Sequence, residues 1–218
     1  MSHTGWSRCY GAQSAGRNPR ARFFCGLVTG EDIALPTKPV LYAIGCGGYP
    51  SEFMPDLVKH AQGEGWDVCV VGTRMGMRFL NADLLRELTG YPVRDDYKRP
   101  DEPDVLPEAD AFVVAPATFN TVNKVAAGIS DTLALGLINE AIGFGKPVIL
   151  APWPNQQLVK HPAFDRSVEI LAEAGVRFVL DRAALPLPAT GRPGATTFPW
   201  TEVHAALAVA KGEILASR

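Results

Sequence analysis

Short apolar runs alternate with helical patterns along the chain from Pro39 onward. The runs are nearly continuous in apolar character, which is typical of parallel strands covered on both faces. Strands are expected at residues 40–44, 68–72, 111–115, 148–151 and 176–180. Strands that alternate with helices indicate βαβ units. The pattern therefore predicts an α/β protein built around a parallel sheet.

Helical spacing of apolar residues follows the first expected strand. Met54, Leu57, Val58 and Ala61 fall on one helical face, and the pattern stops at Gly63. Further helices are expected over residues 122–142, 166–174 and 203–216.

Three segments lack a clear helical or strand pattern. Residues 91–108 are charged and interrupted by proline, and residues 185–199 are rich in Pro, Gly and Thr, so neither is expected to form a helix or a central strand. Residues 1–38, rich in Ser, Gly and Arg, are expected to form a disordered N-terminal arm. Residues 39–218 would then make a single domain.

The overall charge and the cysteines narrow the class of protein. Lys and Arg number 21 against 23 Asp and Glu, which gives no electrostatic reason to expect a nucleic acid or an anionic membrane as partner. The four cysteines lack CxxC spacing and are expected to be thiols in a reducing compartment. No stretch approaches the roughly 18 apolar residues of a membrane span. A cytoplasmic protein with a small-molecule partner is therefore expected.

The end of the first expected strand is rich in glycine. Ligands of open α/β sheets lie beyond the carboxyl ends of the strands. Gly45, Gly47 and Gly48 allow close backbone approach there, and the next helix would present free N–H groups to a phosphate. The spacing matches neither a P-loop nor a full G-x-G-x-x-G motif, so it selects neither an NTP nor NAD. A simple tight turn is the alternative.

The ends of the second and third expected strands carry polar side chains. Thr73 either caps the next helix or offers its hydroxyl to a ligand. Pro116 is expected to end the third strand, and Ala117 leaves room for a flat group. Asn120 and Thr121 can cap the following helix or face a ligand.

These segments together resemble the flavin-containing cysteine decarboxylase family, which includes phosphopantothenoylcysteine decarboxylases and the peptidyl-cysteine decarboxylases of lanthipeptide synthesis. Its hallmark is a strand running into Pro-Ala-Ser-Ala-Asn-Thr, then a lysine, then Gly-Ile-Ala-Asp. The residues that match this hallmark are Pro116, Ala117, Thr118, Phe119, Asn120, Thr121, Lys124, Gly128, Ile129, Ser130 and Asp131. Matches to the family's other segments are Gly47, Gly48, Thr73, Phe79, Pro152, Asn155, His161 and Pro162. The last four resemble the family's substrate clamp.

The resemblance implies a Rossmann-like (flavodoxin-like) three-layer sandwich that forms homo-oligomers, either trimers or dodecamers of trimers. It implies FMN at a subunit interface, with the phosphate near Gly47, Gly48 and Thr73. The flavin ring would lie near Phe79, Ala117, Thr118 and Asn120, and Thr121 and Asp131 complete the implied cofactor-binding set. Asn120 and Asn155 are the implied catalytic residues, and no metal is expected.

The family's chemistry begins with a thiol substrate, which is a small molecule or a peptide. FMN oxidises a cysteine-derived group to a thioaldehyde, whose C=S group accepts the electrons released as CO₂ leaves. The flavin performs the difficult step and the protein aligns the reactants.

The family's catalytic histidine has no counterpart in the expected position. An ungapped alignment places Glu102 and Asp104 there, and no histidine occurs between His60 and His161. A carboxylate ordinarily titrates near pH 4 rather than near 6.5, so it is no equivalent replacement. Either acid could act as a base if partly buried; the alternative is a solvated acidic loop. Cys46 is a candidate redox group or a small buried thiol.

Two functional hypotheses follow. The first is an FMN-dependent enzyme that decarboxylates a cysteine-derived thiol without the usual histidine. The second is a flavin-binding subunit of low activity that completes or regulates a partner's site. A nucleotide-binding module of another kind is a more distant hypothesis, and the Ser-Met-Lys-Thr type motif of flavin prenyltransferases is missing.

Overall fold

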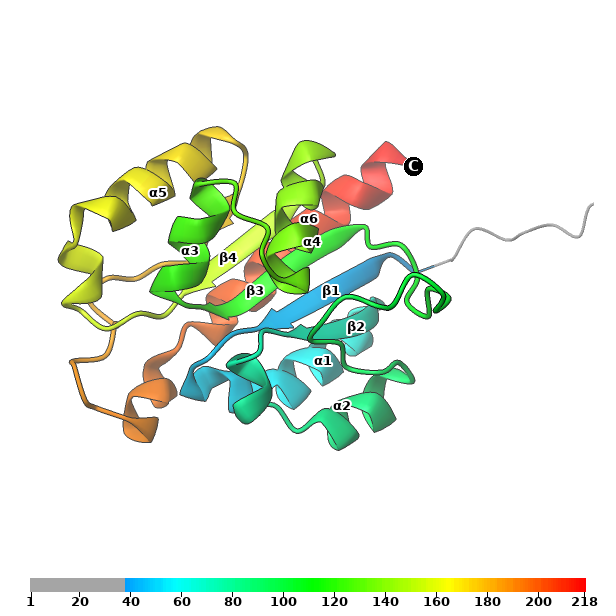
Figure 1. Cartoon of the computed structure of the whole chain (residues 1–218), viewed down its shortest axis with the longest axis horizontal. Coiled ribbons are helices and arrows are strands. Elements are labelled where there is room, and N and C mark those ends of the chain that lie inside the picture. The colour runs from blue at the N-terminus through cyan, green and yellow to red at the C-terminus, as the bar shows by residue number, and fades with distance from the viewer. Residues whose placement is uncertain (1–37) are drawn as a thin grey trace, which may run out of the picture. The chain divides into compact units, whose positions relative to one another are not determined.

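The computed structural model describes residues 38–218, so the expected N-terminal arm, apart from Lys38, lies outside the described residues. A parallel five-stranded sheet with the order β2-β1-β3-β4-β5 forms its centre (Figure 1). The strands are β1 (Val40–Gly45), β2 (Asp67–Gly72), β3 (Ala111–Ala117), β4 (Val148–Pro152) and β5 (Arg177–Phe178). All five strands occur where the apolar runs predict them, and the expected α/β class is confirmed.

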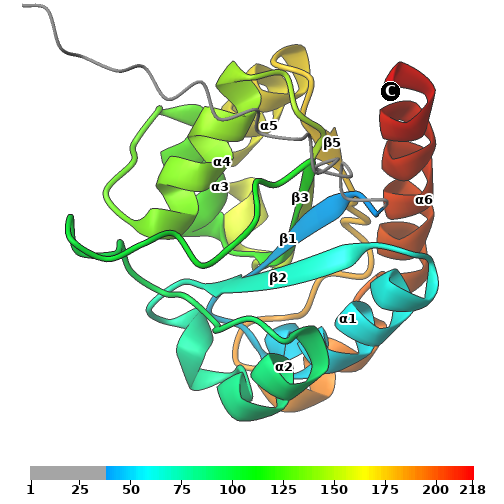
Figure 2. The same ribbon diagram turned by 90° about the vertical axis from the view of Figure 1, so that its right-hand side faces the viewer.

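Helices cover both faces of the sheet (Figure 2). One layer contains α1 (Met54–Gly63), α2 (Ala82–Thr89) and α6 (Trp200–Ser217), and the other contains α3 (Phe119–Ala126), α4 (Leu133–Gly143) and α5 (Pro162–Glu173). Along β1 the side chains alternate, with Tyr42 and Ile44 in the core beneath α3 to α5 and Leu41 and Ala43 in the core beneath α1 and α6. This double burial explains the continuous apolar runs.

The helix expected over residues 122–142 is wrong, because two helices occupy this segment. α3 ends at Ala126, and Gly128 follows with a φ of 67°, a left-handed conformation that stops a helix. α4 then begins after Thr132, whose side chain accepts a hydrogen bond from the N–H of Leu135.

Other expected boundaries also change. α2 was not expected; Asn81 caps its start and Gly90, with a φ of 78°, ends it. α5 starts at Pro162, before the expected residue 166, because His161 caps it. The segment 185–199 contains a short 3₁₀ helix, η4 (Arg192–Thr197), although no helix was expected there.

Two strands differ in length from the expectation. β3 continues through Pro116 to Ala117, and a register shift against β4 between Val114 and Ala117 accommodates the proline. β5 contains only two residues because the chain turns at Asp181, whose carboxylate accepts a hydrogen bond from the N–H of Ala183.

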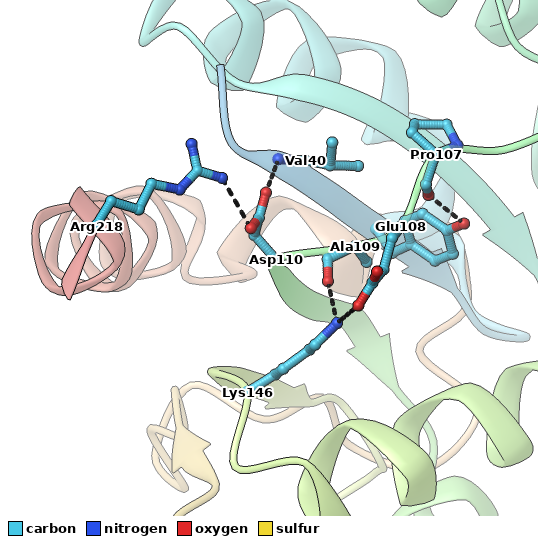
Figure 3. A network of polar contacts seen from close by, with 8 residues as sticks. Val40, Pro107, Glu108, Ala109, Asp110, Lys146 and Arg218 are labelled. Carbon is cyan, nitrogen blue, oxygen red and sulfur yellow. Dashed lines mark hydrogen bonds and ion pairs between the residues drawn. The ribbon is translucent and has the colours of Figure 1, made fainter. Parts of the chain in front are cut away.

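Charged side chains fix the amino ends of the strands (Figure 3). The Asp110 carboxylate accepts hydrogen bonds from the Val40 N–H at 2.7 Å and from Arg218 at 2.9 Å. Lys146 donates to the carbonyl of Ala109 at 2.7 Å. These charge-assisted bonds tie β1, β3 and the end of α6 together at the edge of the sheet opposite the carboxyl ends.

None of the helices in residues 38–218 combines the length and hydrophobicity needed to cross a bilayer.

Replacement of Phe164 is expected to destabilise the fold. Phe164 is fully buried between the sheet and α3, where it stacks on Phe119. We expect Phe164→Ala to lower the free energy of unfolding by about 3–5 kcal/mol, measured by denaturant titration. The matched control is Phe144→Ala, whose side chain is 70% exposed and should change stability by no more than about 0.5 kcal/mol. Equal effects of the two substitutions would contradict the described packing.

Candidate functional site

The strand order reverses between β1 and β3. The chain leaves β1 toward β2 on one side and later returns to β3 on the other side. In open α/β sheets this position opens a crevice beyond the carboxyl ends of the strands. The glycine turn after β1 and the start of α3 after β3 lie at this position.

The ends of three strands meet at a buried thiol. Cys46, which follows β1, lies with its sulfur 3.4 Å from the Thr121 hydroxyl on α3. The turn after β2 reaches the same place through the main chain, since the Thr73 N–H donates to the Gly45 carbonyl at 2.9 Å. Burial raises the pKa of the Cys46 thiol, although the neighbouring polar groups of Thr121, Thr118 and Thr73 act in the opposite direction. Cys46 is therefore a neutral buried thiol, as the second of its two interpretations held.

The hydroxyl groups next to Cys46 form a short chain. Thr118 caps α3 by accepting a hydrogen bond from the Thr121 N–H at 3.2 Å, and the two hydroxyl oxygens lie 2.8 Å apart. The expected caps, Asn120 and Thr121, are therefore corrected to Thr118. If Cys46 donates to Thr121 and Thr121 donates to Thr118, the half-buried Thr118 hydroxyl keeps its own proton to donate outward.

The turns after β1 and β2 touch each other, which explains their glycines. A Cβ on Gly47 would lie 2.8 Å from Met75 Cβ, and a Cβ on Gly76 would lie 2.1 Å from the Gly45 carbonyl oxygen. Both distances exclude a side chain. Thr73 accepts a hydrogen bond from the Gly76 N–H at 3.0 Å, which closes the local turn; Thr73 does not cap the next α-helix, because Asn81 caps α2.

Several apolar side chains in the segments that follow β1 and β2 are exposed or half-buried. The rings of Tyr49 and Phe79 meet edge to face with centroids 5.3 Å apart. Tyr49, Phe53 and Met75 are 38%, 40% and 52% exposed. We call these four residues the apolar rim. Large exposed apolar side chains that gather at one place are typical of binding surfaces.

Asp131 lies in a different electrostatic setting from the glycine turn. Its carboxylate pairs with Lys124 at 2.6 Å. It also lines a cavity of about 310 Å³ with Arg74, Asp95, Asp96 and Thr132. The ion pair holds Asp131 beside α3, and its expected part in cofactor binding stays a prediction.

The segment that resembles the substrate clamp is ordered by its own polar groups. The Asn155 side-chain oxygen accepts hydrogen bonds from the N–H groups of Gln157 and Leu158 at 3.0 and 3.1 Å. His161 accepts one from the Ala163 N–H through Nδ1. The His161 ring meets Phe119 edge to face at 5.9 Å, so the end of the clamp lies beside the start of α3. The Asn155 oxygen is occupied, and its NH₂ group is the part suited to a ligand.

Asn120 is exposed on the first turn of α3. Within residues 38–218 no hydrogen bond links Asn120 to Asn155. The structure thus brings Gly47, Thr73, Thr118 and Thr121 together around Cys46, and it leaves the two asparagines on separate segments.

The acidic residues aligned with the missing histidine belong to a solvated loop. Asp104 pairs with Lys98 at 2.7 Å, and Glu102 accepts a hydrogen bond from the Arg99 N–H; both acids are exposed. Asp104 also lines a cavity of about 530 Å³ beside Tyr42 and the end of α4. This cavity lies before β3, away from the residues that follow the strand. The solvated-loop interpretation is therefore the one supported.

Sequence reasoning missed one feature of this site. Cys46 was weighed as a single residue, whereas the structure places it where the ends of β1, β2 and β3 meet, in contact with Thr121. The only signal in the sequence was its place within the glycine turn. Among residues 38–218, no cluster of three or more His, Cys, Asp or Glu side chains could hold a metal ion.

Comparisons with known proteins agree with this geometry. A family model described as Flavoprotein matches residues 40–207. The coenzyme A biosynthesis bifunctional protein CoaBC of Escherichia coli strain K12 is 28% identical over 150 residues, which cover 66% of this chain and 36% of that protein. The chain thus spans little more than a third of the length of such curated relatives.

Solved structures show the same fold. The FMN-dependent cysteine decarboxylase TvaF from thioviridamide biosynthesis has a TM-score of 0.59 and 26% identity, over 72% of this chain and 98% of that one. A PPC decarboxylase mutant complexed with pantothenoylaminoethenethiol has a TM-score of 0.55 and 25% identity, over 65% of this chain and 81% of that one. The flavodoxin-like three-layer arrangement is thereby confirmed.

Removal of the Thr121 hydroxyl is expected to destabilise the strand ends. Thr121 is 6% exposed and bridges Cys46 and Thr118. We expect Thr121→Val, which keeps the shape, to lower the free energy of unfolding by about 1–3 kcal/mol because buried polar groups lose a partner. The control is Thr201→Val at an exposed position of α6. Its free energy of unfolding should stay within about 0.5 kcal/mol of that of the unmodified protein. A neutral Thr121→Val variant would disprove the bridging role.

Proposed function

The chain belongs to the flavoprotein family, and on this basis we propose that it binds FMN beyond the carboxyl ends of β1, β2 and β3. It is related to phosphopantothenoylcysteine decarboxylases and to FMN-dependent cysteine decarboxylases. The observation that carries the proposal is the junction at Cys46, where three strand ends meet beside a glycine turn at the reversal of strand order.

The residues at this junction suit FMN. The turn at Gly47 is closed to any side chain by Met75, which leaves the main chain itself to face a phosphate. The Thr118 hydroxyl and the N-terminal turn of α3 donate hydrogen bonds without a mobile charge. Phe79 and Tyr49 of the apolar rim offer a surface for the flavin ring.

The proposed activity is the oxidative decarboxylation of a cysteine-derived thiol, either a small molecule or a peptide. Bound FMN supplies a two-electron oxidant for the carbon–sulfur group of the substrate. The N-terminus of α3 favours the thiolate form of the substrate. The NH₂ group of Asn155 donates to the substrate carboxylate, and the amide of Asn120 holds the polar edge of the flavin or the substrate. Asn155 would thereby orient the carboxylate so that CO₂ can leave.

A second candidate is a flavin-binding subunit of low activity that completes or regulates a partner's site. The paired, exposed Asp104 and the lack of a histidine in residues 61–160 support this alternative, because no evident base stands where the family has one.

We also propose that the protein is a cytoplasmic homo-oligomer, a trimer or a dodecamer of trimers. The apolar rim beside the FMN site supports this, because a second copy could cover it. The free thiols of Cys46 and Cys69 agree with a reducing compartment.

Flavin content and gas release test the two candidates. We expect purified protein to release FMN on denaturation, identified by chromatography, at about one equivalent per chain. The enzyme hypothesis further requires CO₂ release from cysteine-terminated peptides or from phosphopantothenoylcysteine. Bound FMN without CO₂ from any such thiol would favour the subunit. A colourless protein that does not take up added FMN would reject both.

A charge placed at Asn120 is expected to weaken flavin or substrate binding. Asn120→Asp replaces a donor by an anion near the proposed polar edge of the flavin or the substrate, so retention of FMN or turnover should fall roughly tenfold or more. The control is Asn81→Asp, which adds the same charge at the cap of α2, where aspartate caps equally well. FMN content and turnover that match the control would remove Asn120 from the site.

A further inference from the structure

A cavity of about 660 Å³ lies between the end of β5 and the start of α6, and the proposed FMN site does not use it. Its size falls within the range of small-ligand pockets. The residues that line it come from three places: the exit of β5, η4 and the first two turns of α6.

Three of the residues that line the cavity are aromatic. Phe178, Phe198 and Trp200 all line the cavity, and the rings of the last two lie 4.5 Å apart. Phe198 also meets Trp153 at 5.1 Å, edge to face. Ring packing therefore connects the wall of the cavity to Trp153 in the clamp segment. The faces of such rings carry negative charge density and attract cations.

The charged residues that line the cavity are all acidic. Asp181 and Glu202 are the only two charged residues among those that line the cavity in the described chain. One oxygen of Asp181 accepts the Ala183 N–H, and its second oxygen is available to a ligand.

None of the ion pairs of residues 38–218 includes Asp181 or Glu202. Two arginines close to the cavity in sequence have other partners, Arg182 with Asp165 and Arg192 with Glu52. The cavity thus keeps the charge of two carboxylates, and its aromatic wall adds to the attraction for a cation.

We propose that this cavity binds an organic cation, an ammonium or guanidinium group carried on an apolar body. An anion would be repelled by both carboxylates, and a neutral apolar ligand would leave them unused. A bare metal ion would gain nothing from three aromatic rings, and the lining holds too few ligands for one. The cation is either a free amine or a basic side chain of a peptide, and both present the same chemistry.

The site is distinct from the FMN crevice. The crevice lies at β1 and β3, whereas the cavity lies at β5, beyond β4 in the sheet. Trp153 lies between them. Its main-chain N–H donates to the Ala117 carbonyl, and its ring packs on Phe198. The proposal therefore does not depend on the presence of FMN.

Calorimetric titration with matched probes tests the ligand class. Benzylammonium, benzyl alcohol and benzoate share a shape and differ in charge. We expect benzylammonium to bind roughly tenfold more tightly than benzyl alcohol, benzoate not to bind, and the difference to shrink in high salt. Comparable binding of the alcohol or the benzoate, or no binding of benzylammonium, would overturn the proposal. A blocked tripeptide, acetyl-Ala-Lys-Ala-amide, distinguishes the sources: tighter binding than benzylammonium identifies a peptide side chain, and weaker binding identifies a free amine.

Two substitutions locate the site. Asp181→Asn and Glu202→Gln should each weaken benzylammonium binding about three- to fivefold, and together about tenfold, because both acids are exposed. Glu87→Gln is the matched control, because Glu87 is an exposed acid on α2, far along the sheet from β5. The affinity of this variant for benzylammonium should be unchanged. Melting curves check that all three variants fold. If neither Asp181→Asn nor Glu202→Gln changes the affinity for benzylammonium, or if Glu87→Gln lowers it equally, the ligand does not bind in this cavity.

Discussion

The pairing of β1 with a parallel neighbour on each side is the constraint on which the site depends. Ile44 aligns with Val71 of β2 and with Val114 of β3, so the three strands end at nearly the same level. Cys46 continues the alternation of β1 and faces the same core as Ile44, beneath α3. A slip of one residue would turn Cys46 toward the opposite helical layer, away from Thr121. The junction therefore exists only in this register.

Close packing of the connecting turns adds a second constraint. Glycine at positions 47 and 76 lets the turn after β1 lie against the turn after β2, where no Cβ would fit. Main-chain N–H groups and the hydroxyls of Thr118 and Thr121 lie at this edge, and the turn after β2 adds the exposed Arg74. Fixed donors and one cation suit the recognition of an anion.

The sequence predicts the features that depend on local patterns and fails on those that depend on distant partners. Apolar runs locate all five strands, because both faces of the sheet are buried. The break at Gly128 was missed because apolar spacing continues across it, and α2 was missed because only Leu85 of this helix is buried. The role of Cys46 depends on its contact with Thr121, 75 residues away, which no spacing rule provides. The aromatic cavity likewise joins residues of β5, η4 and α6 that form one surface only after folding.

The surroundings of the clamp segment differ in charge at its two ends. The side near α3 offers hydroxyls and a helix N-terminus, which favour an anion, whereas the cavity beside β5 offers two carboxylates and aromatic faces, which favour a cation. Gln156 binds the carbonyls of Leu185 and Pro186, so the clamp and the loop after β5 are fixed to each other. Trp153 links the two regions, because its main-chain N–H donates to the Ala117 carbonyl and its ring packs on Phe198. The opposite charge preferences of the two regions therefore arise within one continuous set of contacts.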